Sequence, residues 1–264
     1  MQELPGSFAV CAERLDRDGR EGGEGDARLA WNDERVFPAA SVIKIAVALE
    51  VLCDAAEGSL DLSEALVLRD EDKVAGSGVL SALSSGLRLP IGDVLYLAMA
   101  ISDNAAANLL VDRVGVDAVN ERLAALGLAT TRLDGRIFRE GGERSKTTAT
   151  ELVTLLRRVH RREGLPARAC SELLALLGRT QTASTIGRGL PDERFDPSPP
   201  ITLAYKTGSL EGIVAEAAIV TAPRATYAIA LLSEGSGDSR PNHDNVGRVV
   251  LGAISRAVYE SFTA

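Results

Sequence analysis

The chain changes from a strand-like pattern to a helical pattern and back again along its length. Near both ends, short runs rich in β-branched and aromatic residues are separated by turns with Gly, Pro and Asp, which is typical of β-strands. The first two runs flank a Gly- and Asp-rich turn at 18–26, so they predict a hairpin. The predicted strands cover residues 7–15, 28–31, 202–209, 214–220 and 227–233.

Between these strands the hydrophobic residues recur with a helical period. Residues 41–53 carry apolar side chains around nearly the whole circumference, which predicts a buried helix. Further on, Pro90 suits a first helical turn, and Thr148 with Glu151 forms a capping box. The predicted helices cover residues 41–53, 90–101, 105–114, 116–126, 148–160, 165–177 and 245–262.

This order of elements predicts an α/β (α+β) fold. One five-stranded antiparallel sheet is flanked by N- and C-terminal helices and interrupted by an all-helical insertion. We assign residues 1–40 and 186–264 to the α/β sheet domain and residues 41–185 to the all-α domain. Such a chain is expected to carry its functional site where the two domains meet.

Composition narrows the classes of function. Of the 264 residues, 29 are Lys or Arg and 37 are Asp or Glu, which gives a net charge of −8. An acidic surface repels phosphate backbones, and the apolar runs are far shorter than the ~20 residues of a membrane helix. We therefore expect neither nucleic acid nor a membrane as a partner. With 2 histidines and 3 cysteines, the sequence predicts no metal, no cofactor and no histidine-based triad.

The N-terminal residues lack the basic and apolar regions of a signal peptide. We expect the protein to be cytoplasmic, or exported if a leader has been removed. Cys11, Cys53 and Cys170 are an odd number and lie far apart, which favours buried free thiols over disulfides. Trp31 is expected to be a core residue.

The first motif that suggests chemistry is Ser41-Val42-Ile43-Lys44, at the start of the predicted buried helix. Residues i and i+3 of a helix share a face, so the Lys44 amine can reach the Ser41 hydroxyl. A lysine with a lowered pKa acts as a base, and the helix dipole favours negative charge near the Ser41 N–H. Ser41 is therefore a candidate nucleophile, although these residues also suit an N-cap serine beside a solvated lysine.

Two further motifs each allow two interpretations. Ser102-Asp103-Asn104 falls between two predicted helices, where these residue types are common as caps. Lys206-Thr207-Gly208 falls on a predicted strand, where a glycine indicates close approach of a backbone or ligand, or else a strand end. All three motifs in this order form the signature of penicillin-recognising serine enzymes.

With these motifs the sequence resembles the class A serine β-lactamases. Segments 76–80, 95–110 and 189–191, together with Lys206 to Gly212, extend the resemblance over nearly the whole chain. The resemblance implies a serine β-lactamase/transpeptidase-like fold. It also implies a hydrolase that opens β-lactam rings through an acyl-enzyme.

The resemblance gives each motif residue a role. Ser41 is the acylated nucleophile, Lys44 accepts or relays its proton, and Ser102 hands a proton to the leaving nitrogen. The N–H groups of Ser41 and Ser209 form the oxyanion hole. The implied substrate-binding residues are Asn104, Lys206, Thr207, Gly208 and Ser209.

The chain departs from the family pattern where the acyl-enzyme is hydrolysed. Family members use a glutamate on an Ω-shaped loop, in a Glu-x-x-Leu-Asn segment that this chain lacks. The loop here, residues 135–146, is shorter and offers Glu140 and Glu143. We take Glu140 as the candidate catalytic base, with a solvated loop carboxylate as the alternative. Asn108 matches an asparagine that supports the glutamate in the family.

A second departure concerns the substrate carboxylate, which the family tends to bind with an arginine from one of two positions. Those positions hold Thr185 and Ala215 here, and Arg188 is a nearby candidate substitute. Three hypotheses therefore stay open: a β-lactamase with slow deacylation, an esterase or peptidase of the same fold, and a β-lactam-binding protein that is acylated without turnover. In each case we expect a monomer and a small-molecule β-lactam, ester or amide.

Overall fold

The computed structural model describes residues 6–16, 27–137, 145–191, 201–240, 242 and 244–264. By their contacts the residues form two compact units. The first unit comprises Met1–Val42, Thr147–Arg157 and Ala183–Ala264, and the second comprises Ile43–Lys146 and Arg158–Thr182. The sheet lies in the first unit, and most of the helices lie in the second.

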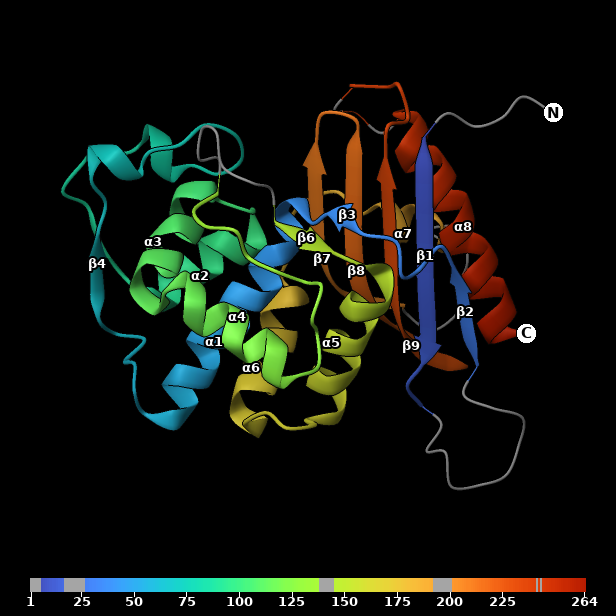
Figure 1. Ribbon diagram of the computed structural model, residues 1–264, viewed down its shortest axis with the longest axis horizontal. Coiled ribbons are helices and arrows are strands. Elements are labelled where there is room, and N and C mark those ends of the chain that lie inside the picture. Colours follow the sequence, from blue (N-terminus) through green and yellow to red (C-terminus); the bar gives the residue numbers. More distant parts are fainter. Residues whose placement is uncertain (1–5, 17–26, 138–144, 192–200, 241, 243) are drawn as a thin grey trace. The chain divides into compact units, whose positions relative to one another are not determined.

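The first unit contains a five-stranded antiparallel sheet with strand order β2-β1-β9-β8-β7 (Figure 1). β9 lies between β1 and β8, so the two ends of the chain share one sheet. The predicted sheet and the predicted β1–β2 hairpin are therefore confirmed. The strands are β1 (Ser7–Arg14), β2 (Arg28–Trp31), β7 (Thr202–Leu210), β8 (Ile213–Ala222) and β9 (Ala225–Glu234).

Two helices pack on one face of this sheet, α7 (Thr185–Arg188) and α8 (Val246–Thr263). Alternate strand residues point to this face, as the two-residue period of a strand requires. Asn245 caps α8 by accepting a hydrogen bond from Arg248 N at 3.3 Å. The core between sheet and helices includes Phe8, Val10, Ala12, Ile186, Leu190, Val214, Ala218, Val220, Tyr227, Ile229, Leu231, Leu251, Val258 and Phe262.

Two expectations about the first unit need correction. In the described part of the chain, which begins at residue 6, no helix precedes β1. The sheet is flanked instead by α7 and α8. Trp31 is 56% exposed rather than buried, because it lies on β2, an edge strand whose four residues are all exposed.

α1 (Lys44–Glu57) is the central helix of the second unit. Its residues from Lys44 to Cys53 are all buried, as predicted for this segment, because neighbouring helices pack around it. Those neighbours are α2 (Ile91–Ala100), α3 (Asn104–Val114), α4 (Val116–Ala125) and α6 (Ala167–Leu177). α5 (Ala149–Arg161) contributes residues to both units, and Thr148 Oγ1 accepts from Glu151 N as its predicted cap.

The α-helix begins later than the sequence pattern predicts. Ala40–Ile43 form a 3₁₀ turn, η1, and α1 starts only at Lys44. Ala40 has a φ of 45°, a left-handed conformation that no α-helix continues through. Ser41 therefore lies in the turn that leads into α1, and Lys44 lies at the first position of the helix.

Very short elements have no periodicity, and the sequence pattern does not predict them. They are β3 (Phe37–Pro38), β4 (Ala65–Val67), β5 (Arg88–Pro90), β6 (Lys146–Thr147), η2 (Asp70–Asp72) and η3 (Leu80–Ala82). Cys11, Cys53 and Cys170 are buried free thiols, as predicted. Of the helices in the described ranges, none is both long and apolar enough to cross a membrane.

An ion pair connects α1 to α4 in the second unit. Glu50 is 4% exposed and accepts from Arg122 Nε at 2.7 Å and from Nη2 at 3.4 Å. The hydrogen bond with Glu50 raises the pKa of Arg122. Arg122 also lies 3.3 Å from Glu57, whose side chain is exposed. One arginine thus compensates a buried and an exposed carboxylate.

Arg122→Met is expected to lower the free energy of unfolding by about 3 kcal/mol, because it leaves Glu50 charged and buried. Glu57→Ala is the matched control and is expected to cost less than about 1 kcal/mol, because that pair is exposed. Urea unfolding followed by circular dichroism measures both. Equal losses in the two variants would contradict the assignment of the stability to the buried pair.

Candidate active site

In the second unit, the Lys44 side chain forms the centre of a buried polar group. Lys44 is 1% exposed, and its Nζ donates to Ser102 O at 2.6 Å, to Ser102 Oγ at 3.2 Å and to Asn104 Oδ1 at 2.7 Å. Asn104 Nδ2 donates in turn to Ala75 O at 2.9 Å. A buried ammonium needs such acceptors, since an uncompensated charge is costly in the interior. The first two sequence motifs therefore meet through Lys44.

Ser102 adopts a left-handed backbone conformation, with a φ of 59°. Such a conformation is costly for a residue other than glycine and persists only where the surroundings enforce it. Here the Ser102 carbonyl accepts from both Lys44 Nζ and Ser77 Oγ, each at 2.6 Å. These bonds hold the carbonyl and hydroxyl of Ser102 toward the same lysine.

Asp103 has a structural role that matches the cap interpretation of its motif. Its Oδ1 accepts from Ala106 N at 2.9 Å and caps α3, while Oδ2 accepts from Val79 N at 2.6 Å and Leu80 N at 2.9 Å. Gly78 is required beside it, because a Cβ there would overlap the Asp103 side chain and its φ is +110°. The middle residue of the motif thus anchors the segment that carries Ser77.

Hydrogen bonds from Asn108 connect α3 to Ile137, the last described residue before a gap at 138–144. Asn108 is fully buried, its Nδ2 donates to Ile137 O at 3.1 Å, and its Oδ1 accepts from Ile137 N at 2.6 Å. The side-chain amide of Asn108 therefore binds both main-chain polar groups of Ile137. Glu140 and Glu143, the predicted base and its alternative, lie outside the described residues.

In the first unit, the backbone of η1 lies against β7. A Cβ on Gly208 would stand 2.8 Å from Ser41 N and 3.0 Å from Val42 N, which is too close for any side chain. Gly208 lies within β7, opposite Ala215 of β8, and not at a strand end. The glycine of the third motif is therefore explained by close approach of another backbone, that of Ser41. Ser209, the next residue on β7, is exposed.

Lys206 is the second buried lysine, with no exposed surface, and its Nζ donates to Thr207 O at 2.8 Å. Burial lowers the pKa of Lys206 to about 7, and the negative charge of Glu216 opposes this shift. The side chain thus changes charge close to neutral pH.

Glu216 is a buried carboxylate that the sequence analysis did not single out. It accepts from Ser184 Oγ, from Thr185 N at 2.6 Å and from Ile186 N at 3.3 Å. Burial raises the pKa of Glu216 to about 7, while these hydrogen bonds oppose the rise. Glu216 lies opposite Thr207 in the β7–β8 register, so it is the anion near Lys206. Its sequence signal is a single acidic residue in the otherwise apolar run 213–220.

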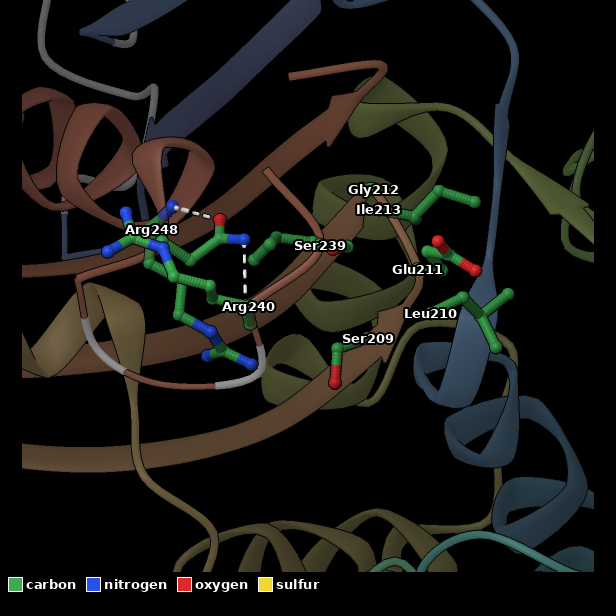
Figure 2. A pocket seen from close by; sticks show the side chains of 10 residues that line it. Ser209, Leu210, Glu211, Gly212, Ile213, Ser239, Arg240 and Arg248 are labelled. Atoms are coloured by element: carbon green, nitrogen blue, oxygen red, sulfur yellow. Dashed lines mark hydrogen bonds between the residues drawn. The ribbon is translucent and has the colours of Figure 1, made fainter. Parts of the chain in front are cut away.

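A pocket of about 440 Å³ lies beside the end of β7. Figure 2 shows the turn residues Leu210 to Ile213 on one side of it and Arg240 and Arg248 on the other. Arg240 is bound to both carboxylate oxygens of Asp238, at 2.9 and 2.7 Å. Arg248 lines the pocket and donates to Thr185 Oγ1 at 3.2 Å. It forms no ion pair with a carboxylate of the described residues, although its charge lowers the pKa of Glu216.

The two positions that lack the family arginine are buried, Thr185 at 2% and Ala215 at 1% exposure. Arg188 lies at the surface, and its side chain packs beside Gly252 of α8. The cation bound to Thr185 is Arg248, which sequence reasoning missed because it lies 63 residues further along the chain. Within the described ranges, no three His, Cys, Asp or Glu side chains gather as metal ligands.

Comparison with known proteins identifies the family and the fold of this chain. The model of the β-lactamase enzyme family matches residues 3–262. The β-lactamase from Sphaerobacter thermophilus DSM 20745 is 30% identical, with a TM-score of 0.85 over 97% of this chain and 91% of that chain. A class A β-lactamase variant of the last common ancestor of Gram-negative bacteria is 23% identical, with a TM-score of 0.82 over 99% and 95% of the two chains.

PBP-A is similar to the same degree. It is 27% identical, with a TM-score of 0.85 over 99% of this chain and 91% of that chain. A PBP-A variant with a leucine replaced by glutamate, solved as an acyl-enzyme complex with penicillin G, matches equally well. The fold of this protein is thus the one shared by serine β-lactamases and PBP-A, and the chain belongs to the β-lactamase enzyme family.

Proposed function

We propose that this protein is a serine hydrolase that opens β-lactam rings through an acyl-Ser41 intermediate and releases the product slowly. The observation that carries the proposal is the set of hydrogen bonds from buried Lys44 to Ser102 and Asn104. Lys44 follows Ser41 by three residues, so covalent continuity keeps the nucleophile close to this polar group. The proposed substrate is a small molecule, bound by a monomer without a cofactor.

The proposed acylation uses Lys44 as a proton relay. Ser41 Oγ forms a bond to the β-lactam carbonyl carbon as its proton passes to Lys44 Nζ. In the same step the Lys44 ammonium gives one of its own protons to Ser102 Oγ, so the charge of the lysine is unchanged. The 3.2 Å contact between Lys44 Nζ and Ser102 Oγ supports this direction of transfer. At the same time Ser102 gives its hydroxyl proton to the leaving nitrogen as the C–N bond breaks. The N–H groups of Ser41 and Ser209 are the proposed oxyanion donors, supported by the close approach of Ser41 N to Gly208.

The proposed contacts for the substrate carboxylate come from β7 and α8. Lys206 and Thr207 supply a positive charge and a hydroxyl, and Arg248 adds a second cation at the place where Thr185 replaces the family arginine. Asn104 is the proposed partner of the substrate amide.

Two alternatives differ from this proposal, one in the acyl donor and the other in the absence of deacylation. Glu140 remains the predicted base. A hydrolase for esters or small peptides would use the same groups on another acyl donor. A β-lactam-binding protein would be acylated at Ser41 without turnover. The similarity to PBP-A supports this second alternative, since a PBP-A variant was solved as an acyl-enzyme complex with penicillin G.

Mass spectrometry with penicillin G or a chromogenic cephalosporin, timed against product release, tests the proposal. We expect one adduct per chain on Ser41, a burst of about one equivalent and a slow steady state. Ser41→Ala is expected to abolish the adduct, and Lys44→Ala to slow its formation by at least about a hundredfold. An adduct on another serine, or an active Ser41→Ala variant, would exclude the proposed nucleophile.

The charge of Lys206 predicts a pH dependence. Because its pKa lies at about 7, the ammonium that attracts the substrate carboxylate is lost as the pH rises through this range, so KM for penicillin G is expected to increase. Glu216→Gln removes the anion that raises this pKa and is expected to move the increase to lower pH. A neutral ester substrate is the control, and its KM should stay constant. A flat KM for penicillin G from pH 6 to 9 would contradict the role of Lys206.

Arg248→Met is expected to raise KM for penicillin G roughly ten- to hundredfold, because one charge-assisted contact is worth about 1.5–3 kcal/mol. Arg240→Met is the matched control. It removes a pocket arginine whose charge Asp238 already compensates, so a change below about threefold is expected. Steady-state kinetics compares the two. A larger effect of the control would assign the carboxylate to Arg240 instead.

A further inference from the structure

β8 carries a single charged residue, on the face of the sheet that α7 and α8 cover. Val214, Ala218 and Val220 lie on this face in the core of the first unit. Glu216 shares the face with them, because alternate residues of a strand point the same way, and it is fully buried there. A buried carboxylate is costly unless hydrogen bonds compensate it. The groups that bind Glu216 therefore indicate its role.

These groups belong to the first turn of α7. Oε2 of Glu216 accepts from Thr185 N at 2.6 Å and from Ile186 N at 3.3 Å. Oε1 accepts from Ser184 Oγ. The first N–H groups of a helix have no partner within the helix, and an acceptor with a negative charge is favourable near them. Glu216 therefore joins the start of α7 to the middle of β8.

Thr185 connects the same turn to α8. Its main-chain N–H donates to Glu216, and its Oγ1 accepts from Arg248 Nη1 at 3.2 Å. The short, β-branched side chain of threonine is stiff, so the place of Oγ1 follows the main chain of the turn. An arginine side chain, by contrast, is long and has many rotamers. The contact with Thr185 therefore selects where the guanidinium lies beside the pocket at the end of β7 (Figure 2).

The charges around Glu216 agree with this connection. Burial raises the pKa of Glu216, and the hydrogen bonds and the nearby charge of Arg248 oppose this rise. Burial lowers the pKa of Lys206 on β7, and the charge of Glu216 opposes that shift. One carboxylate thus interacts with both cations that the proposed function assigns to the substrate carboxylate.

We propose that Glu216 is a positioning residue for substrate binding, which holds the first turn of α7 so that Thr185 places Arg248 at the pocket. This inference rests on the proposed contact between Arg248 and the substrate carboxylate. It adds that the arginine contributes only while a residue of β8 accepts the N–H groups of α7. The negative charge is not required for this, because one oxygen, Oε2, accepts both N–H groups.

The test separates the acceptor role of Glu216 from its charge. Glu216→Gln keeps an oxygen for both N–H groups and turns its own NH₂ toward Ser184 Oγ, whereas Glu216→Met offers neither. Both variants remove the charge, so any effect on Lys206 is common to them. Each variant is combined with Arg248→Met in the full chain. Mass spectrometry follows the formation of the Ser41 adduct over a range of penicillin G concentrations.

Arg248→Met is expected to raise the half-saturating concentration of penicillin G roughly ten- to hundredfold in the unsubstituted chain and in Glu216→Gln. In Glu216→Met the same replacement should change this concentration less than about threefold, because the guanidinium is already displaced. Glu216→Met alone should lie at least about tenfold above Glu216→Gln. The limiting rate of adduct formation should stay within about threefold in all these chains, which loss of the fold would not allow.

Thr185 offers a second pair of variants, which tests the inference even where Glu216→Met does not fold. Thr185→Val removes the Oγ1 acceptor and is expected to raise the half-saturating concentration roughly tenfold or more. Arg248→Met should then add less than about threefold. Thr185→Ser keeps a hydroxyl and should stay within about threefold of the unsubstituted chain.

Two results would contradict the inference. An equal effect of Arg248→Met in the Glu216→Gln and Glu216→Met chains would show that Arg248 is placed without Glu216. A lower limiting rate at an unchanged half-saturating concentration would show that Glu216 serves only the stability of the fold. In both cases the Ser41 adduct still forms, and the proposed function stands. An unsubstituted chain that forms no Ser41 adduct would instead refute the proposed function, and this inference with it.

Discussion

The arrangement of the second unit depends on one charge, the ammonium of Lys44, which the helix packing around α1 leaves without access to solvent. Its acceptors are oxygens of Ser102 and Asn104. Ser102 has a left-handed backbone conformation, which directs its carbonyl toward the lysine. Ser77 contributes a second donor to that carbonyl. Removing one acceptor would leave part of a buried charge unsolvated, at a cost of several kcal/mol. The strained turn is thus sustained by electrostatics.

Lys206 is the buried lysine of the first unit, and its charge is compensated in another way. Its buried amine has an anion in its own sheet, Glu216, which is itself held by the N-terminal residues of α7. One lysine is held by neutral oxygens of a strained turn, while the other is electrostatically coupled to a carboxylate. The second arrangement responds to pH, since both partners titrate near neutrality.

The elements with strong periodicity were predictable from the sequence. The bounds of β7, β8, β9 and α3 lie within two residues of their predicted ranges, because alternation and helical spacing report burial directly. The start of α1 was not predictable, because a short 3₁₀ turn at 40–43 has the same apolar pattern as a first α-helical turn. Periodicity also does not identify partners far apart in sequence. The contacts of Thr185 with Arg248, and of Asn108 with Ile137, needed the fold to become visible.

The close contact between Gly208 and the Ser41 backbone excludes other residues at position 208. The hydrogen bonds of Asn108, by contrast, allow different side chains at position 137. At position 208 even one methyl group would collide with backbone atoms, so any substitution must move the backbone of Ser41 and Val42. Asn108 binds only the main-chain N–H and C=O of residue 137, and every amino acid except proline has both. Evolution can therefore alter the side chain at 137 without dismantling the loop attachment.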